Sequence, residues 1–227
     1  NTNIFLNLVE NIRLNRLKTR VLCIGSSEEY GMIRAEELPV IESKIPLPLN
    51  PYAVARYSQE LLSNVYCRGF NLDIILTRSF NHVGVGQRDD FVIPSITKQM
   101  VSAMKLGKKI IKLNVGDVSI IRDFVDVSDV VRAYHDLFFK GKTGSVYNIC
   151  SSEGNSIMSI IEILSKKLEI EVEIIVDASL IRPVDNMVVI GSNLKIEKEI
   201  NWRPCYSINE SLDKLIQYYI NLNEDSI

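Results

Sequence analysis

The order of the secondary-structure elements constrains the fold of this chain more than any other feature of the sequence. Short apolar strands alternate with longer amphipathic helices, and a capping box formed by Ser207 and Glu210 predicts the start of a last helix. The expected helices span residues 3–18, 51–68, 92–106, 127–139 and 156–168, and the expected strands 21–24, 73–79, 110–115, 146–150 and 172–176. This alternation favours an α/β fold with a mostly parallel sheet, followed after about residue 150 by a smaller mixed lobe.

The helix expected over residues 51–68 has clear boundary signals. Asn50 is a good N-cap, Pro51 suits the first helical position, and Gly69 is expected to end the helix. The proline-bearing residues 32–50 before it are expected to form a loop. The first turns of this helix therefore follow directly on a long loop.

Composition and charge exclude several classes of function. The 227 residues have a formal net charge of −2, which gives no electrostatic reason to expect nucleic acid or an anionic membrane as a partner. No apolar run approaches the length of a membrane span, and residues 1–18 lack the pattern of a signal peptide, so we expect a cytoplasmic protein. The four cysteines and two histidines have neither metal-site nor redox spacing, which predicts reduced thiols and no metal site.

The glycines supply no recognisable pyrophosphate-binding loop within this sequence. A doubly wound dinucleotide fold opens with a strand, a glycine-rich turn and a helix, because the pyrophosphate must approach the backbone at the N-terminus of that helix. Of the eleven glycines, only Gly84 and Gly86 form a G-x-G pattern, and residues 87–90 contain no third glycine. We expect a substrate-side loop there, and either a sequence that is a fragment or a naturally short protein.

Three polar motifs lie where an open parallel sheet binds its ligands. Residues 25–31 (GSSEEYG) follow a strand, residues 52–56 (YAVAR) lie in the first turns of a helix, and residues 78–82 (RSFNH) end the next strand. Ligands of such sheets bind outside the carboxyl ends of the strands, where the first and third motifs both fall. The sequence therefore predicts that the three motifs contribute to one site.

The spacing of Tyr52 and Arg56 indicates acid–base chemistry. The two residues are four apart, so both side chains lie on one face of the helix. A free tyrosine has a pKa of about 10, and a fixed cation beside it lowers that value. With the hydroxyl of Ser26 bonding the same substrate oxygen, the set predicts transfer of a hydride at carbon and a proton at oxygen. Taken singly, such a pair is more often a surface contact and such a serine a turn residue, so the prediction depends on the ordered set.

This ordered set resembles the Ser/Tyr/Lys signature of the extended short-chain dehydrogenases/reductases. Over nearly its whole length the chain is similar to the GDP-6-deoxy-4-ketohexose reductases and the GDP-mannose 4,6-dehydratases. The motifs that carry the similarity are IGSSEEYGMI, NPYAVAR, RSFNHVGVGQ, FVIPSITKQ, IRDFVDVSDVVRAY, VYNICS and RPVDNMVVIGSN. The resemblance implies a partial doubly wound, Rossmann-like parallel sheet that lacks its first strands. It assigns residues 1–150 to the NAD(P)-binding domain, with some substrate-lobe segments, and residues 151–227 mainly to a small mixed α/β substrate lobe.

The resemblance also implies a role for each matching residue. Ser26 would polarise the substrate carbonyl, Tyr52 would be the general acid/base, and Arg56 occupies the place of the family lysine that bonds the nicotinamide ribose. The implied cofactor is NADP or NAD, contacted by Tyr52, Arg56, Ser79 and Phe80. The implied residues around a GDP-linked sugar are Ser27, Asn81, His82, Val92, Lys98, Arg122 and Arg182, and Asn1 falls at the place of a structural asparagine.

Plainer interpretations of some of these residues stay open. Arg122 and Arg182 can be turn arginines in water, His82 can be a loop histidine bonded by the backbone, and Glu28–Glu29 can be a solvated turn. Arginine at position 56 keeps the positive charge, but its planar fork cannot copy the ammonium group of lysine.

Three hypotheses of function follow. The first is an NAD(P)H-dependent reductase of the C4 ketone of a GDP-4-keto-6-deoxyhexose. The second is a GDP-mannose 4,6-dehydratase or sugar-nucleotide epimerase, with Glu28 as the base beside the keto group. The third is a non-catalytic, degenerate or truncated family member that binds a sugar nucleotide. The resemblance also implies a homodimer through the helices at 3–18 and 51–68. An apolar seam of Val54, Leu61, Leu62 and Val65 would serve it, although core packing explains those residues equally well.

Overall fold

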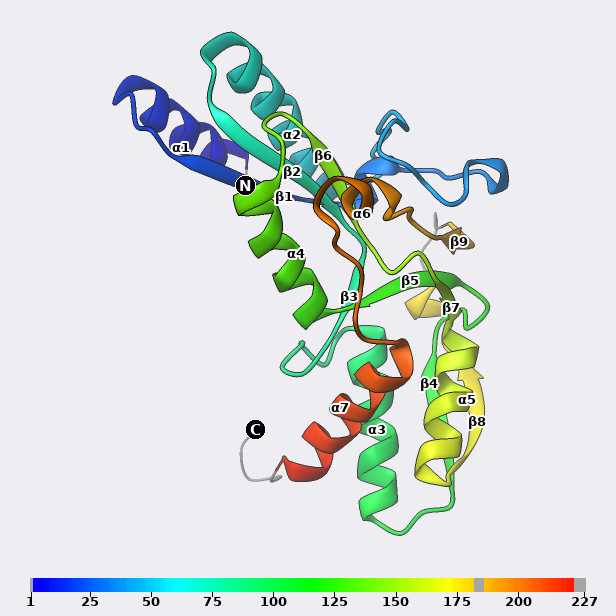
Figure 1. Ribbon diagram of the computed structural model, residues 1–227. Coiled ribbons are helices and arrows are strands. Elements are labelled where there is room, and N and C mark those ends of the chain that lie inside the picture. Colours follow the sequence, from blue (N-terminus) through cyan, green and yellow to red (C-terminus); the bar gives the residue numbers. More distant parts are fainter. Residues whose placement is uncertain (1, 182–185, 223–227) are drawn as a thin grey trace.

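The molecule consists of two parts joined by a small mixed sheet (Figure 1). The computed structural model describes residues 2–181 and 186–222. The first part contains a parallel sheet with the strand order β1 (Arg20–Ser26), β2 (Asp73–Ser79) and β6 (Val146–Ile149). The joining sheet contains β3 (Asn81–Val83), β5 (Ile121–Asp126), β7 (Gly154–Ser156) and β9 (Val188–Val189).

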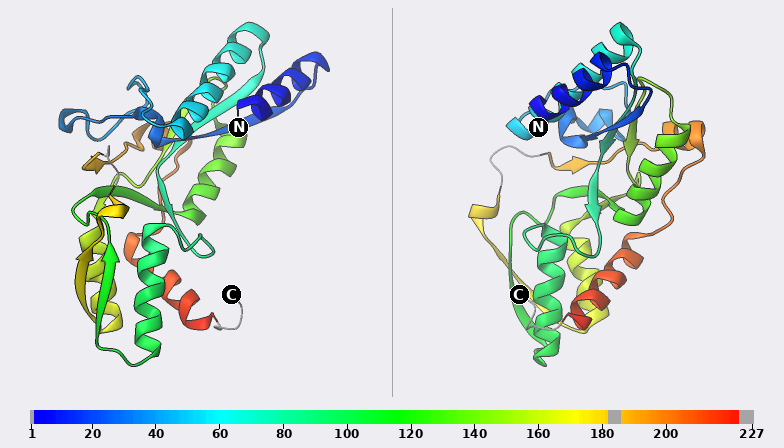
Figure 2. Two further views of the ribbon diagram at one scale, coloured as in Figure 1. Left: turned by 180° about the vertical axis from the view of Figure 1, so that it is seen from behind. Right: turned by 90° about the vertical axis from the view of Figure 1, so that its left-hand side faces the viewer.

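Helices cover both faces of the parallel sheet in the first part. On one face, α1 (Thr2–Leu14) and α2 (Pro51–Phe70) lie side by side, as both views in Figure 2 show, and pack on β1 and β2. On the other face, α4 (Val127–Lys140) and α6 (Leu194–Ile200) pack on β2 and β6 around the buried Trp202. The middle strand is buried from Ile74 to Ser79 because it is covered on both faces, and its residues Ile74–Leu76 are apolar. The predicted α/β fold with a doubly wound parallel sheet is therefore confirmed.

The second part has its own apolar core. It contains the parallel pair β4 (Ile110–Val115) and β8 (Glu171–Val176) and three helices, α3 (Val92–Lys105), α5 (Ile157–Leu168) and α7 (Ile208–Asn221). The predicted capping box at the start of α7 is confirmed, since the Ser207 and Glu210 side chains each bond the other residue's backbone. Segments from both sides of residue 150 build this core, and the domain division at that residue stays a prediction.

The exact ends of two predicted helices are wrong. The first helix ends at Leu14 and not at residue 18, because Arg16 adopts a left-handed conformation (φ 51°) and the N–H of Leu17 bonds the carbonyl of Ile12 at 3.0 Å. Helix α2 continues through Gly69 to Phe70, and Asn71 ends it with φ 55°. Asparagine tolerates this conformation better than most residues, so it replaces glycine as the C-cap.

The remaining described elements are three short 3₁₀ helices, η1 (Ser27–Tyr30), η2 (Ala35–Glu37) and η3 (Ala178–Leu180). Among the described helices, none is long and apolar enough to cross a bilayer. The described residues also contain no group of three or more His, Cys, Asp or Glu side chains that could hold a metal ion. Cys23 and Cys150 are buried, Cys205 is exposed, and the cysteines are free thiols.

Candidate active site

The register of β1 and β2 brings the first and third motifs to the same edge of the sheet. The two strands pair in parallel from Arg20 opposite Asp73 to Ser26 opposite Ser79. Both strands end at these serines. The serine hydroxyls of two distant segments therefore lie at the carboxyl edge of the sheet, where parallel α/β folds bind ligands.

Asn50 connects the second motif to this edge. Its Oδ1 accepts a hydrogen bond from the N–H of Ala53 at 2.8 Å, which caps α2 and confirms the predicted helix start. Its Nδ2 donates to Oε2 of Glu28 at 2.9 Å. Glu28 lies on η1, two residues after Ser26, so this side chain holds the start of α2 beside the Ser26–Ser27 segment.

Tyr52 and Arg56 share one face of α2, as the four-residue spacing predicts. The guanidinium carbon of Arg56 lies 5.2 Å from the centroid of the Tyr52 ring. Nη1 of Arg56 donates to the carbonyl of Ile24 on β1 at 3.1 Å and to Oε1 of Gln59 at 3.4 Å. The phenol is 48% exposed, which leaves it open to a ligand. The first turns of α2, with the phenol of Tyr52 and the guanidinium of Arg56, therefore lie beside the end of β1 that carries Ser26.

Tyr134 on α4 belongs to the same site, although the sequence did not single it out. Its hydroxyl lies 2.6 Å from Oγ of Ser79. Burial raises the pKa of Tyr134, the bond to Ser79 lowers it, and Tyr52 and Arg56 are near enough to act on it in opposite directions. The residue ends the motif IRDFVDVSDVVRAY and follows the buried Val130 by one helical turn, a spacing that places it toward the sheet.

The residues after Ser79 have different environments. Phe80 is 3% exposed and packs with Tyr30, Val40, Cys150 and Val189 in a small core cluster. Its neighbour Asn81 is exposed and pairs through its backbone with β5. His82 is half-buried, burial lowers its pKa, and its Nδ1 has no hydrogen-bond partner among the described residues. Phe80 is thus part of the core below the site, whereas its two successors lie nearer the surface.

The other implied substrate residues lie on separate elements. Val92 begins α3 and is 41% exposed. Further along α3, Lys98 donates to Asp89 at 2.6 Å. Arg122 lies on β5, is 9% exposed and donates to the carbonyl of Ile121 at 2.9 Å. Arg182 and Asn1 lie outside the described residues. The binding roles of all of these residues stay predictions.

The groups at the sheet mouth fit one half of a dinucleotide. Tyr52 is 48% exposed and Arg56 is partly exposed, so both side chains are open to a ligand such as a nicotinamide ribose at this edge of the sheet. The sequence contains no G-x-G-x-x-G pattern to receive the pyrophosphate. The side chains at this edge are thus of the kind that can contact the reacting end of NAD(P), and their binding roles stay predictions.

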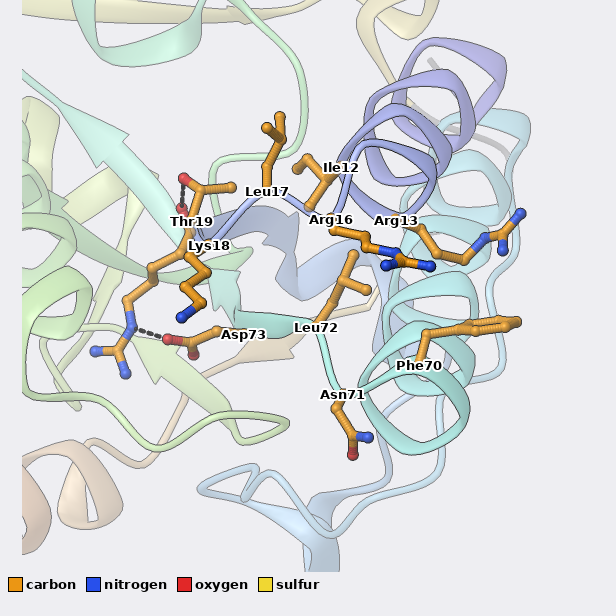
Figure 3. Close-up of a pocket in the computed structure, with 11 residues that line it drawn as sticks. Ile12, Arg13, Arg16, Leu17, Lys18, Thr19, Phe70, Asn71, Leu72 and Asp73 are labelled. Atoms are coloured by element: carbon orange, nitrogen blue, oxygen red, sulfur yellow. Dashed lines mark hydrogen bonds and ion pairs between the residues drawn. The ribbon is translucent and has the colours of Figure 1, made fainter.

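A surface cavity of about 570 Å³ lies at the opposite edge of the sheet (Figure 3). It is lined by the starts of β1 and β2, including Arg20 and Asp73, whose side chains form an ion pair at 2.7 Å. The ends of α1 and α2 and the segments that lead from them into β1 and β2 complete the lining. Because Arg20 and Asp73 begin the strands that Ser26 and Ser79 end, this cavity is distinct from the candidate active site.

A parallel sheet covered by helices on both faces, with serine, tyrosine and a cation at its carboxyl edge, defines an oxidoreductase of the short-chain dehydrogenase/reductase type. Within this class, the chain belongs to the GDP-mannose 4,6 dehydratase family, whose model matches residues 1–215. The family resemblance noted from the motifs is thereby confirmed.

Individual relatives support the same assignment. The chain is 36% identical over 211 residues to the GDP-6-deoxy-D-mannose reductase of Pseudomonas aeruginosa, covering 93% of this chain and 69% of the relative. It is 32% identical over 185 residues to the GDP-6-deoxy-D-talose 4-dehydrogenase of Aggregatibacter actinomycetemcomitans, covering 82% of this chain and 60% of that one. The structure of the RMD protein from Pseudomonas aeruginosa complexed with NADPH matches with a TM-score of 0.88 and 35% identity, over 95% of this chain and 71% of that one.

Proposed function

We propose that this chain acts in the NAD(P)H-dependent reduction of the C4 ketone of a GDP-linked 4-keto-6-deoxyhexose. The observation that carries the proposal is the grouping of Tyr52, Arg56 and the Ser26 segment at one edge of the sheet. The 36% identity to a GDP-6-deoxy-D-mannose reductase supports the choice of substrate, and the NADPH-bound relative supports the choice of cofactor.

In this reaction the side chains handle the substrate oxygen. When bound, the cofactor supplies a hydride to the carbonyl carbon. The hydroxyl of Ser26 donates a hydrogen bond to the ketone oxygen, which polarises the carbonyl and stabilises the charge that develops on it. Tyr52 donates its phenolic proton to the same oxygen to give the alcohol, and solvent restores that proton. Arg56, whose guanidinium carbon lies 5.2 Å from the centroid of the Tyr52 ring, is proposed to contact the nicotinamide ribose.

The remaining implied residues are proposed to hold the cofactor and the sugar nucleotide. Ser79 lies beside Ser26 in register, and Phe80 supports this edge from the core below it. Arg122 and Arg182 suit the diphosphate because a guanidinium can bond two phosphate oxygens at once. We further propose that residues 1–150 form mainly the cofactor-binding domain and residues 151–227 mainly the substrate lobe.

The test measures loss of NADPH absorbance with a GDP-4-keto-6-deoxyhexose as substrate. Tyr52→Phe removes the proton donor and is expected to lower kcat by about 100-fold or more, the usual effect of losing a general acid. Tyr57→Phe removes a phenol from the next turn of α2 and is the matched control, expected to keep its rate. Equal rates for the wild type and Tyr52→Phe would contradict the proposal.

The position of Glu28 favours a dehydratase as the second candidate. Its carboxylate is held by Asn50 beside the Ser26 segment, where it can remove a proton adjacent to a keto group. A dehydratase recycles its cofactor, so turnover of GDP-mannose without net consumption of NADPH would support this candidate over the reductase. Calorimetry that finds GDP binding without NADPH binding would instead support a non-catalytic sugar-nucleotide binder.

We also propose that the chain forms a homodimer through α1 and α2. Val54, Leu61 and Val65 are 50%, 49% and 57% exposed on α2, and Ile4 on α1 is 74% exposed. Leu62, in contrast, packs into the core, so it contributes to the monomer. Sedimentation should show a dimer that Val65→Glu converts to a monomer with an unchanged far-UV spectrum. A monomeric wild type would contradict the proposal.

A further inference from the structure

A buried group of charges lies beneath the Ser26 segment. Arg78 on β2 is 3% exposed, and its Nε and Nη2 donate to the two oxygens of Glu60 on α2 at 3.0 and 2.6 Å. Its Nη1 donates to the carbonyls of Glu42 and Lys44. The two parallel hydrogen bonds to Glu60 pair the guanidinium charge with one carboxylate. Arg78 therefore donates to Glu60 and to two carbonyls, and makes no hydrogen bond to another acid in the described part of the chain.

A second carboxyl group, that of Glu29, enters the same buried space. Glu29 lies on η1 and is 0% exposed. Its Oε1 accepts a hydrogen bond from the backbone N–H of Ser26 at 2.7 Å. Its Oε2 lies 3.9 Å from Nε of Arg78, too far for a hydrogen bond, and has no hydrogen-bond partner among the described residues. Two acidic side chains, Glu29 and Glu60, therefore lie beside one buried cation, that of Arg78. The Nε and Nη2 of Arg78 already donate to Glu60.

The backbone leaves space for this carboxyl at one position. A Cβ added to Gly25 would lie 2.4 Å from Oε1 of Glu29 and 2.4 Å from the carbonyl of Thr77. Only glycine therefore lets the carboxyl reach back across the end of β1 to the N–H of Ser26. Because Gly25 has no side chain, the Glu29 carboxyl can reach the N–H of Ser26 and fix the backbone there.

We propose that Glu29 is a positioning residue, which holds the Ser26 backbone at the mouth of the sheet through a buried, protonated carboxyl. The consequence for catalysis rests on the proposed function, because it is Ser26 that contacts the substrate ketone there. Protonation resolves the charge imbalance, since one arginine then faces a single carboxylate.

The surroundings of Glu29 agree with this protonation state. The pKa of Glu29 is raised to about 8. Burial is the largest cause, the Ser26 N–H lowers the pKa, the charge of Glu60 raises it, Arg78 lowers it, and the side-chain contact with Glu60 raises it. The nearest titratable group on β1 is Cys23, whose thiol has a pKa raised by burial to about 11 and is neutral in this range. The ionisation of Glu29 at alkaline pH should therefore be felt directly at the amide of Ser26.

The first test follows the Ser26 amide by ¹H–¹⁵N NMR of the chain without ligands. The amide proton should move downfield as Glu29 ionises, with a midpoint near the value of about 8 given above for Glu29. Glu29→Gln should abolish the titration, and Glu28→Gln on the same turn should keep it. A midpoint near the ordinary glutamate value of about 4.3, or no titration at all, would overturn the proposal.

The second test separates positioning from simple support of the fold. Glu29→Gln keeps an acceptor for the Ser26 N–H and should retain kcat. Glu29→Leu removes that acceptor and should lower kcat about tenfold or more with little change in KM. This pattern is expected when a hydrogen bond made in the transition state is misplaced. Equal kcat values for the two variants would overturn the proposal. If the wild type does not oxidise NADPH, the proposed function fails, while the NMR result still decides the role of Glu29.

Discussion

Asp123 on β5 provides the sharpest test of how the joining sheet is held to the segments that follow β6 and β9. Its carboxylate is 0% exposed and accepts from the N–H and Oγ of Ser151 at 2.7 and 2.6 Å. It also accepts from the N–H groups of Ser152 at 2.9 Å and Gly191 at 3.2 Å. These donors belong to the turn after β6 and the segment after β9, so one side chain fixes both. Burial raises the pKa of Asp123 to about 6, which still leaves it ionised at neutral pH.

Asp123→Ala is expected to lower the free energy of unfolding by about 3 kcal/mol or more. The substitution removes the partner of three backbone N–H groups, and each buried donor without a partner costs about 1–3 kcal/mol. The matched control is Asp117→Ala, since Asp117 also accepts from a serine N–H and hydroxyl, those of Ser119 at 2.8 and 2.6 Å, but in an exposed turn. There water replaces the lost acceptor, and the expected loss is below about 1 kcal/mol.

Urea unfolding followed by fluorescence measures both variants, because the single tryptophan, Trp202, is fully buried in the core of the first part. The reasoning would be refuted if Asp123→Ala lost no more stability than Asp117→Ala. It would also be refuted if the loss came entirely from a changed slope against urea with an unchanged midpoint, which indicates an altered unfolded state.

Three further outcomes are expected. Arg56→Lys should raise the NADPH-dependent rate about tenfold, because an ammonium group bridges ribose and phenol in a way the guanidinium cannot; an unchanged rate would show that residue 56 is not limiting. The raised pKa of Glu29 implies stability that is complete below its unfolded value of about 4.5 and lost as pH rises from there through about 8, so the stability of Glu29→Gln relative to the wild type should increase between about pH 4.5 and pH 8 in thermal unfolding. The exposed Cys205 should react with a thiol reagent at once. The buried Cys150, whose pKa is raised by burial well above the ordinary value, should react only when the protein unfolds. Mass spectrometry that finds both cysteines modified together would contradict this expectation.

Local patterns in the sequence predicted the α/β fold and the placement of Tyr52 beside Arg56 on one face of α2. The four-residue spacing of Tyr52 and Arg56 and the N-cap at Asn50 depend on helix geometry alone, and the structure contains both. Strand β5 was missed because its residues Arg122, Asp123 and Asp126 are charged, and a buried strand is expected to be apolar. Asp123 and Asp126 also have partners in distant segments, Ser151 and Ser211, which no local pattern reveals.

The same limit applies to the residues around the site. Tyr134 reaches Ser79 across 55 positions, and Glu60 reaches Arg78 across 18. The sequence allowed Glu28 and Glu29 to be a solvated turn. The structure shows Glu28 exposed and Glu29 buried, with its carboxyl against Gly25. Sequence reasoning therefore identified the groups expected to react but not the groups that hold them in place.

The pairing of β4 with β8 has a practical consequence for dissecting this protein. All six residues of β8 pair with β4, which lies more than fifty positions earlier in the chain, and α5 packs against α3 from the same earlier stretch. A piece cut at residue 150 would expose the edge of β8 and the apolar side of α5. Such a piece should aggregate when it is expressed alone, and mixing it with residues 1–150 should restore a soluble complex.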